Sequence, residues 1–285
     1  MRTHGVGLEV YGRTDVGKVR TNNEDAFVVA DLMVSQPIHA MQRPAELEVG
    51  KHGVLLAGSD GMGGAQAGEV ASALTLHSLR RGLSERPPST AERALTSSVE
   101  RANRKVWDVA VGSGRKGMGA TLTAVLVEGT RAYVAEVGDS RAYVLRSGRL
   151  IQLTHDQSCV QLMLDAGTLT REEAETFQFK NVIMQAIGTK PNVVVAMNRF
   201  TLRRGDWLLL CSDGLSGAVK DDEIRGVLVS SPSLEAACTR LIDLANSRGG
   251  EDNITVLLAE TTGDGLLVPS GEERVSLETL QAFNA

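Results

Sequence analysis

Two segments of this chain nearly repeat each other, and each ends in an aspartate followed by a glycine. They are Leu55–Gly61 (LLAGSDG) and Leu208–Gly214 (LLLCSDG). A short apolar run of this kind is typical of a buried strand, so Asp60 and Asp213 are each expected where a strand leaves the core. One Asp-Gly pair after a strand usually indicates only a turn. A matched second copy favours a shared chemical role.

Further carboxylates adjoin two other apolar strands. Asp252 precedes the run 254–258, and Glu24 and Asp25 precede the run 26–28. If these four acidic clusters converged, their charges would repel each other unless a hard cation lay among them. Oxygen ligands without His or Cys clusters favour Mg²⁺ or Mn²⁺, and the carbonyl of Gly61 could approach such an ion. The alternative is a set of separate strand-end turns, because one sequence does not show that these segments meet.

Motifs of several other hydrolytic and nucleotide-binding enzymes are absent. The chain has no G-x-x-x-x-G-K-[ST] loop, and its segment 61–64 (GMGG) lacks the G-x-G-x-x-G spacing of a dinucleotide fold. No cysteine is followed by an arginine six positions later, and no G-x-S-x-G elbow occurs. The sequence therefore excludes Walker-type nucleotide hydrolysis, the cysteine-phosphatase loop and the usual serine-hydrolase nucleophile.

Composition narrows the class of protein further. The 285 residues carry a net charge of -5 without a concentrated basic stripe, and only 4% are aromatic, so no nucleic-acid partner is expected. The apolar runs are much shorter than the roughly 20 residues of a membrane helix, and the N-terminus lacks the apolar stretch of a signal peptide. The three cysteines form no CxxC pair. We expect a cytoplasmic protein with no membrane segment, disulfide framework or thiolate zinc site.

The periodicity of apolar residues predicts the elements that must position these carboxylates. Groups of strands and groups of helices follow one another in the order strands, helices, strands, helices, strand, without a regular βαβ alternation. This order favours an α+β fold of antiparallel sheets covered by helices. We expect one domain over residues 1–260 and a tail over 261–285 that is disordered or docks on a partner. The more detailed expectations are a plain connector at 35–51, a helix with the apolar stripe Val70, Leu74 and His77, a capping box from Ser89 to Glu92, and an antiparallel meander over 118–151.

Six short motifs in a fixed order carry a resemblance to a known family. They are RTNNED (20–25), DGMGG (60–64), GMGAT (117–121), GDSR (138–141), SDGL (212–215) and DNIT (252–255). With these motifs the sequence resembles the metal-dependent protein serine/threonine phosphatases of the type 2C (PPM) family, in its bacterial form. The likeness covers nearly the whole chain. It implies a four-layer α-β-β-α sandwich of two antiparallel sheets flanked by helix pairs, with a dinuclear Mn²⁺ or Mg²⁺ centre at one edge.

The resemblance also implies a role for each acidic residue named above. Asp60 would bridge both ions, Glu24 and the Gly61 carbonyl would hold one ion, and Asp213 with Asp252 would hold the other. Three further roles are implied for Asp25, which would support the ligands by hydrogen bonds, for Arg20, which would bind the substrate phosphate, and for Asp139, which with Asp213 would bind a weak third ion.

Two departures from the family pattern concern proton donors. Family members have a histidine at the position of Met62 or of Ala65, so the chain lacks the usual candidate for a general acid. In the segment that resembles the mobile flap, about residues 154–187, Gln157 stands where a histidine is usual and His155 lies two positions earlier. These departures put the general acid and the substrate contacts of the flap in question.

The implied function is hydrolysis of phosphoserine and phosphothreonine in proteins by a hydroxide that bridges the two ions, in opposition to a serine/threonine kinase and as a monomer. Two other functions stay open on the same fold. One is a pseudophosphatase that only binds phosphoproteins, against which the full set of carboxylates counts. The other is a phosphomonoesterase of small molecules, because the shared chemistry lies in the metal centre rather than in the pocket wall.

Overall fold

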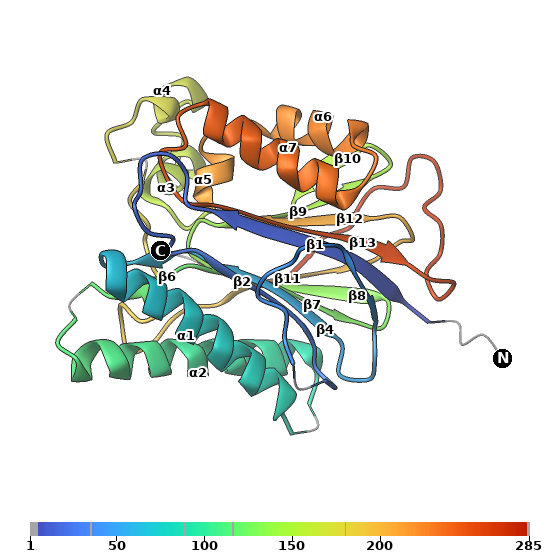
Figure 1. Cartoon of the computed structure of the whole chain (residues 1–285), viewed down its shortest axis with the longest axis horizontal. Helices are drawn as coiled ribbons and strands as arrows, with labels where there is room; N and C mark the ends of the chain where they lie inside the picture. The colour runs from blue at the N-terminus through green and yellow to red at the C-terminus, as the bar shows by residue number, and fades with distance from the viewer. Residues whose placement is uncertain (1–4, 35, 88, 116, 180, 284–285) are drawn as a thin grey trace.

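Two six-stranded antiparallel sheets lie face to face at the centre of the computed structural model (Figure 1), which describes residues 5–34, 36–87, 89–115, 117–179 and 181–283. The first sheet has the order β10 (Arg149–Gln152), β9 (Arg141–Arg146), β12 (Trp207–Cys211), β13 (Ile254–Thr262), β1 (Gly7–Asp15), β3 (Ala45–Glu48). The second has the order β14 (Glu278–Gln281), β11 (Ala196–Thr201), β8 (Arg131–Val137), β7 (Leu122–Glu128), β4 (Val54–Ser59), β2 (Ala26–Asp31). A small ribbon joins β5 (Gly61–Met62) to β6 (Gly119–Ala120).

Helices cover the outer face of each sheet. The second sheet carries α1 (Ala65–Ser84) and α2 (Ala91–Gly112), and the first carries α5 (Asp213–Ser216), α6 (Asp221–Ser230) and α7 (Leu234–Ser247) (Figure 1). Two short helices, α3 (Cys159–Asp165) and α4 (Arg171–Glu175), belong to the flap segment. The predicted four-layer α-β-β-α sandwich is confirmed.

Three apolar layers hold these four layers of structure together. Leu79 and Leu95 lie in the layer beneath α1 and α2, Leu56 and Leu210 lie between the sheets, and Leu241 lies under α7. The central strands are buried on both faces, which explains why β4, β7 and β12 appear in the sequence as continuous apolar runs. Within the described ranges, no helix combines the length and the apolar character needed to cross a membrane.

The predicted apolar stripe of the first helix was right at Leu74, which packs against the core, and wrong at Val70 and His77. Val70 is 39% exposed and His77 is exposed, whereas Leu76 and Leu79 are fully buried, so α1 turns a different face to the sheet. The start of the helix fixes this orientation, because Gly68 packs directly against the Glu24 side chain. The next helix begins one residue later than predicted, since the Thr90 side chain accepts the Arg93 amide at its N-terminus.

The predicted meander is divided between the two sheets. Strands β7 and β8 pair in the second sheet, whereas β9 and β10 pair in the first. The chain crosses from one sheet to the other at Gly138, Asp139 and Ser140. Gly138 has φ +111°, and a Cβ at this position would lie 2.8 Å from the Thr121 side chain, so the crossing is tight. Asp139 therefore lies at the edge where the two sheets meet, not in a hairpin.

Two segments that were expected to be irregular contain strands. Residues 45–48 of the predicted connector form β3, which pairs with β1 at the edge of the first sheet. In the tail, Leu266 is buried, Glu273 forms an ion pair of 2.7 Å with Arg203, and β14 pairs with β11. The expectation of a disordered tail was wrong, because the segment leaves the first sheet at β13 and adds an edge strand to the second.

Candidate metal centre

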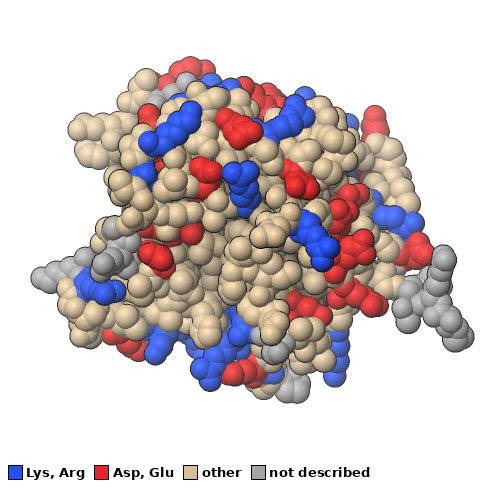
Figure 2. Space-filling view, viewed as in Figure 1, with Lys and Arg blue, Asp and Glu red and all other residues tan. Residues whose placement is uncertain are grey.

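The predicted acidic residues lie at one edge of the sandwich, where strands of both sheets begin or end. Asp60 separates β4 from β5, and Glu24 and Asp25 precede β2, whose first residue pairs with the last residue of β4. From the first sheet, Asp213 follows β12 and Asp252 precedes β13. Figure 2 shows acidic side chains in a recess at the left of the molecule, between its two helical layers.

Asp60 is at the electrostatic centre of this group. Burial is the largest cause that raises its pKa well above the usual value, and the charges of four other carboxylates add to the shift. These are Asp25, Asp213, Asp139 and Asp252. Since one carboxyl feels all four charges, acidic residues from both sheets converge on it, which is one of the two arrangements that the sequence left open.

The neighbouring carboxyls show the same crowding. Burial raises the pKa of Asp213, the charge of Asp252 raises it further, and a hydrogen bond shared with the Asp60 carboxyl lowers it. Burial also raises the pKa of Asp139 to about 8, with the charge of Asp213 as the next cause. Such a group retains protons at neutral pH unless a cation replaces them.

Asp25 is held through one carboxylate oxygen by two hydroxyl groups. Its Oδ2 accepts hydrogen bonds from Ser212 Oγ at 2.7 Å and from Thr255 Oγ1 at 2.8 Å. Burial raises the pKa of Asp25 to about 7 although these hydrogen bonds lower it. Asp25 precedes a strand of the second sheet, whereas Ser212 and Thr255 belong to the first, so these bonds join the sheets directly below the acidic group.

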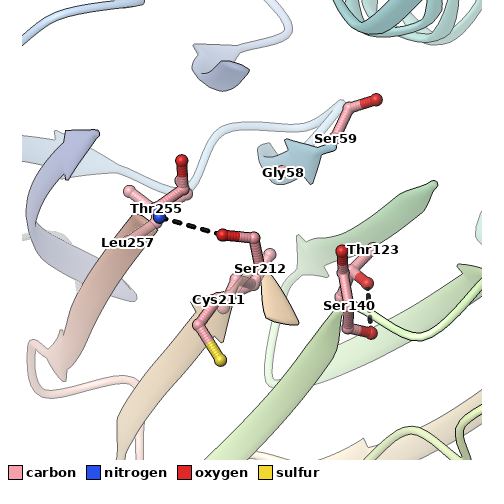
Figure 3. A pocket seen from close by; sticks show the side chains of 9 residues that line it. Gly58, Ser59, Thr123, Ser140, Cys211, Ser212, Thr255 and Leu257 are labelled. Carbon is pink, nitrogen blue, oxygen red and sulfur yellow. Dashed lines mark hydrogen bonds between the residues drawn. The ribbon is translucent and has the colours of Figure 1, made fainter. Parts of the chain in front are cut away.

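Hydroxyl groups line a small cavity between the sheets beneath the carboxylates (Figure 3). In it, the Thr255 amide donates to Ser212 Oγ at 2.9 Å, and Thr123 Oγ1 donates to the Ser140 carbonyl at 2.8 Å. A Cβ at Gly58 would have no neighbour within 4 Å, so the absent side chain leaves this space open. Polar groups at this position fix the strand ends that carry the carboxylates.

Glu24 and Gly61 lie side by side, as their implied shared role requires. The Gly61 amide donates to the Glu24 carbonyl at 3.2 Å, and the Ser72 hydroxyl donates to the same carbonyl at 2.6 Å. An added Cβ at Gly68 would overlap Glu24 Oε2, so glycine at 68 leaves the space that the carboxylate occupies. Gly68 was not among the predicted site residues. A glycine in the first turns of a predicted helix was the available signal.

Asn253 is a second residue to which the sequence motifs gave no role. Its Oδ1 accepts the Glu24 amide at 2.8 Å, and its Nδ2 donates to the carbonyls of Val16 and Asn22, both at 2.9 Å. The loop between β1 and β2 carries Arg20 and Glu24, so Asn253 fixes that loop beside Asp252. The Asp-Asn pair in front of an apolar strand was the signal in the sequence.

Arg20 lies at the rim of the acidic group. Its Nη2 is 2.8 Å from Asp252 Oδ2, and the side chains are 54% and 36% exposed. An exposed ion pair of this kind contributes little to stability. The guanidinium is therefore close to a candidate ligand and still open to solvent, which suits a group that binds an incoming anion.

The flap histidine does not point to the carboxylates. The His155 side chain is 65% exposed and pairs with Asp165 at 2.7 Å. Gln157, at the family's usual histidine position, is 1% exposed and hydrogen-bonded within the protein. Met62 is half-buried in β5. The Ala65 side chain lies outside the described part of the structure.

The donor set fits a hard cation. All the candidate ligands offer oxygen, and the buried atoms Asp25 Oδ1 and Asp213 Oδ1 have no hydrogen-bond partner. In the described part of the chain, no three acidic, histidine or cysteine side chains already stand close enough to hold one ion. The carboxylates therefore converge without forming a closed ligand shell.

Comparison with known proteins decides the family. The model of the family "Protein phosphatase 2C" matches residues 44–259, which include Asp60, Asp139, Asp213 and Asp252. The chain belongs to the protein phosphatase 2C family. The match begins after Arg20 and Glu24, so the assignment of these two residues depends on their geometry within this phosphatase 2C fold.

Curated relatives agree with this family. The chain is 37% identical over 253 residues to the serine/threonine phosphatase stp of Listeria welshimeri, covering 87% of this chain and 94% of that protein. It is 38% identical over 254 residues to the serine/threonine protein phosphatase PstP of Mycobacterium tuberculosis, covering 89% of this chain. The match spans only 45% of PstP, less than half of that relative's length.

A solved structure has the same fold. It is the catalytic domain of the serine/threonine protein phosphatase PstP in complex with two manganese ions, with a TM-score of 0.75 and 36% identity. The likeness covers 90% of this chain and 99% of that domain. The phosphatase 2C fold described above therefore accounts for nearly the whole of the compared domain.

Proposed function

We propose that this chain hydrolyses phosphoserine and phosphothreonine in proteins, using two Mn²⁺ or Mg²⁺ ions. The observation that carries the proposal is the convergence of carboxylates from both sheets on Asp60, where burial and like charge hold protons that a metal centre would replace. The names of the relatives support the substrate class, and the manganese complex of the PstP domain supports the ions. A serine/threonine kinase would supply the phosphorylated substrates.

Each residue has a defined task in this proposal. Asp60 would bridge the ions, Glu24 and the Gly61 carbonyl would hold one, and Asp213 with Asp252 would hold the other. When bound, such a pair supplies hydroxide from water near neutral pH and offsets charge on the phosphoryl oxygens. Arg20 would donate two hydrogen bonds to the substrate phosphate, after its exposed contact with Asp252 is exchanged.

Two supporting tasks complete the proposal. Asp25, held by two hydroxyls, would fix the ligands without binding substrate. Asp139 would serve with Asp213 for a weakly held third ion, in agreement with the action of the Asp213 charge on Asp139. Met62 has no proton to donate to the leaving alkoxide, so the side chain at this position takes no part in that step.

A comparison of substrates tests the function. We expect Mn²⁺-dependent turnover of a phosphoserine peptide with kcat/KM well above that for nucleotides, and loss of all turnover with excess chelator. Preference for nucleotides or para-nitrophenyl phosphate would support a small-molecule phosphomonoesterase instead. Binding of the phosphopeptide without turnover at any Mn²⁺ concentration would indicate a pseudophosphatase. Full turnover in excess chelator would contradict the metal centre.

A further inference from the structure

The base of the flap encloses the turn that carries Asp139. On one side, Glu136 Oε2 accepts the His155 amide at 2.8 Å. On the other, the guanidinium of Arg141 forms three hydrogen bonds of 2.6 to 2.9 Å with Asp156. His155 of the flap thus binds Glu136, three residues before Asp139, and Asp156 binds Arg141, two residues after it.

Gln157 completes this arrangement at the residue directly before Asp139. Its Oε1 accepts the Gly138 amide at 2.9 Å, its Nε2 donates to the Glu136 carbonyl at 3.3 Å, and its own amide donates to the Gly138 carbonyl at 2.9 Å. The side chain is buried, so it cannot contact a protein substrate in this conformation. It acts on the inside of the protein, unlike a surface contact of the flap.

The same glutamine also holds the returning end of the flap. Gln157 Oε1 accepts a second hydrogen bond, from Gln185 Nε2 at 2.8 Å, and the Gln157 carbonyl accepts the Met184 amide at 2.7 Å. The neighbouring residues Ser158 and Ile183 pair as an isolated bridge. Both ends of the flap therefore meet at Gln157.

We propose that Gln157 is a positioning residue that fixes the Asp139 turn and both ends of the flap as one unit. The proposal rests on the proposed function for its catalytic consequence, but the coupling itself is a property of the fold. A flap that moves at its base would displace Asp139, because the hydrogen bonds of Gln157 reach Gly138 on one side and residues 184 and 185 on the other. Gln157 thus links both ends of the flap to the turn that carries Asp139.

The substitution Gln157→Met tests this role with little change in side-chain length. Methionine keeps the apolar stem and removes the amide, whereas Gln157→His retains one donor and one acceptor in a neutral ring. Gln161→Met, on α3 of the same flap, is the matched control, because its side-chain contact with Asp165 is exposed. If Gln157→Met fails to fold, Gln185→Met removes one of the same hydrogen bonds and replaces it as the test.

Two measurements report on the two halves of the unit. The first is hydrogen exchange of the Met184 amide in metal-free protein, since that amide bonds to the Gln157 backbone, which the substitution leaves in place. The second is the Mn²⁺ concentration that gives half of the maximal activity, because Asp139 would hold the third ion and the thermal stabilisation depends on the first two. For Gln157→Met we expect faster Met184 exchange and a Mn²⁺ midpoint of activity raised about 10- to 100-fold, the usual effect of losing a residue that orients metal ligands.

The variants together decide the proposal. Gln157→His should return both readouts to within a few-fold of the original chain, Gln185→Met should be intermediate, and Gln161→Met should change neither. Faster Met184 exchange with an unchanged Mn²⁺ midpoint would overturn the coupling to Asp139, and no change in either would overturn the role altogether. If the original chain hydrolyses no phosphopeptide, the proposed function fails, while Met184 exchange in the metal-free protein still tests the role of Gln157 in the fold.

Discussion

The two Ser-Asp-Gly segments have nearly the same sequence, but their serines have different partners. Ser59 ends β4 and donates at 2.7 Å to the carbonyl of Thr121, the residue directly before β7 of the same sheet. Ser212 follows β12 and donates to Asp25, a residue of the opposite sheet. The first serine fixes a strand end and the second joins the sheets under the acidic group. Equal local sequence therefore gives equal local geometry but unequal roles.

The glycines of the two segments account for their equal local geometry. A Cβ at Gly61 would lie 2.1 Å from the Gly68 carbonyl oxygen, and a Cβ at Gly214 would lie 2.0 Å from the Asn253 carbonyl oxygen. Both positions need glycine because backbone passes directly over them. In each sheet this close approach places the preceding aspartate at the common edge, and the two aspartates share a hydrogen bond there.

Substitution of the two aspartates tests the shared role and gives the largest expected effect. Asp60→Asn and Asp213→Asn should each lower Mn²⁺-dependent kcat/KM about 10³- to 10⁵-fold, because metal ions supply several kcal/mol of transition-state stabilisation. In chelator both variants should unfold at a higher temperature, Asp60→Asn more so, since four other carboxylates act on Asp60.

The control for these variants is Asp222→Asn on α6, whose carboxyl is 99% exposed. It should leave both activity and melting temperature unchanged. Retained activity with unaltered metal dependence in Asp60→Asn or Asp213→Asn would show that the two Ser-Asp-Gly segments only form turns.

In the sequence, Asp139 lies between the two Ser-Asp-Gly segments, where the chain crosses from the second sheet to the first. Substitution of Asp139 should give the next largest effect. Asp139→Ala should leave binding of the first two ions and thermal stability in place but lower kcat about 10²- to 10⁴-fold, the range of a general-acid contribution. If Asp139 only caps the turn, stability should instead fall by about 0.5 to 2 kcal/mol with little change in kcat. Kinetics across a Mn²⁺ titration and thermal unfolding distinguish the two outcomes.

Arg20 extends the comparison to the rim above Asp252. Arg20→Ala should lower kcat/KM for the phosphopeptide about 10- to 150-fold, mainly through KM, because a charge-assisted hydrogen bond contributes about 1.5 to 3 kcal/mol. Arg225→Ala on α6 is the control, since its nearest carboxylate lies 3.9 Å away on the exposed surface. Steady-state kinetics that differ by less than twofold from the original chain would make Arg20 a solvated surface residue.

The fold could be predicted where the signal is local. The apolar runs around Leu56 and Leu209 are buried strands because no polar residue interrupts them. Tertiary packing decided the rest. The face that α1 turns to the sheet depends on the contact of Gly68 with Glu24. The crossing of the chain at Gly138 depends on the pairing of β9 with β12 in the first sheet. Neither contact is present in the periodicity of the sequence.

The residues of the candidate metal centre also divide into those that local sequence predicts and those that only tertiary packing reveals. The carboxylates Asp60, Asp213 and Asp252 could be located because each adjoins an apolar strand, and the near-repeat indicated a common role. The residues that position these carboxylates could not be predicted, since Ser212 and Asn253 form hydrogen bonds to residues 187 and 229 positions away in the sequence. Their types are common in turns, so only the fold shows what they bind.

The unequal serines give a smaller and more selective effect. Ser212→Ala should lower kcat/KM about tenfold or more, because it removes a hydrogen bond that orients Asp25 beneath the ligands. Ser59→Ala is its matched partner and should leave kcat/KM within about threefold, although each variant loses roughly 1 kcal/mol of stability with its buried hydrogen bond. Equal losses of activity in the two variants, measured at saturating Mn²⁺, would show that the segments have equal roles after all.

The pH dependence of stability compares Asp60 with Asp213 once more, and the difference expected between the two variants is the smallest effect. In the folded chain burial raises the pKa of Asp25 to about 7 and that of Asp139 to about 8, from 3.8 for an ordinary aspartate. Between pH 4 and 8 the metal-free folded state therefore binds more protons than the unfolded state.

The free energy of unfolding must then fall as the pH rises through that window, because stability decreases with pH wherever the folded state holds the extra protons. Urea unfolding in chelator at a series of pH values measures this slope. Saturating Mn²⁺ should flatten or reverse it, since the ions bind the ionised carboxylates. Asp60→Asn should flatten the slope more than Asp213→Asn does, because the charges of four other aspartates act on Asp60, whereas Asp252 is the main charge that raises the pKa of Asp213. A slope that both substitutions leave unchanged would mean that the two aspartates titrate independently of the group, contrary to a single centre built from both sheets.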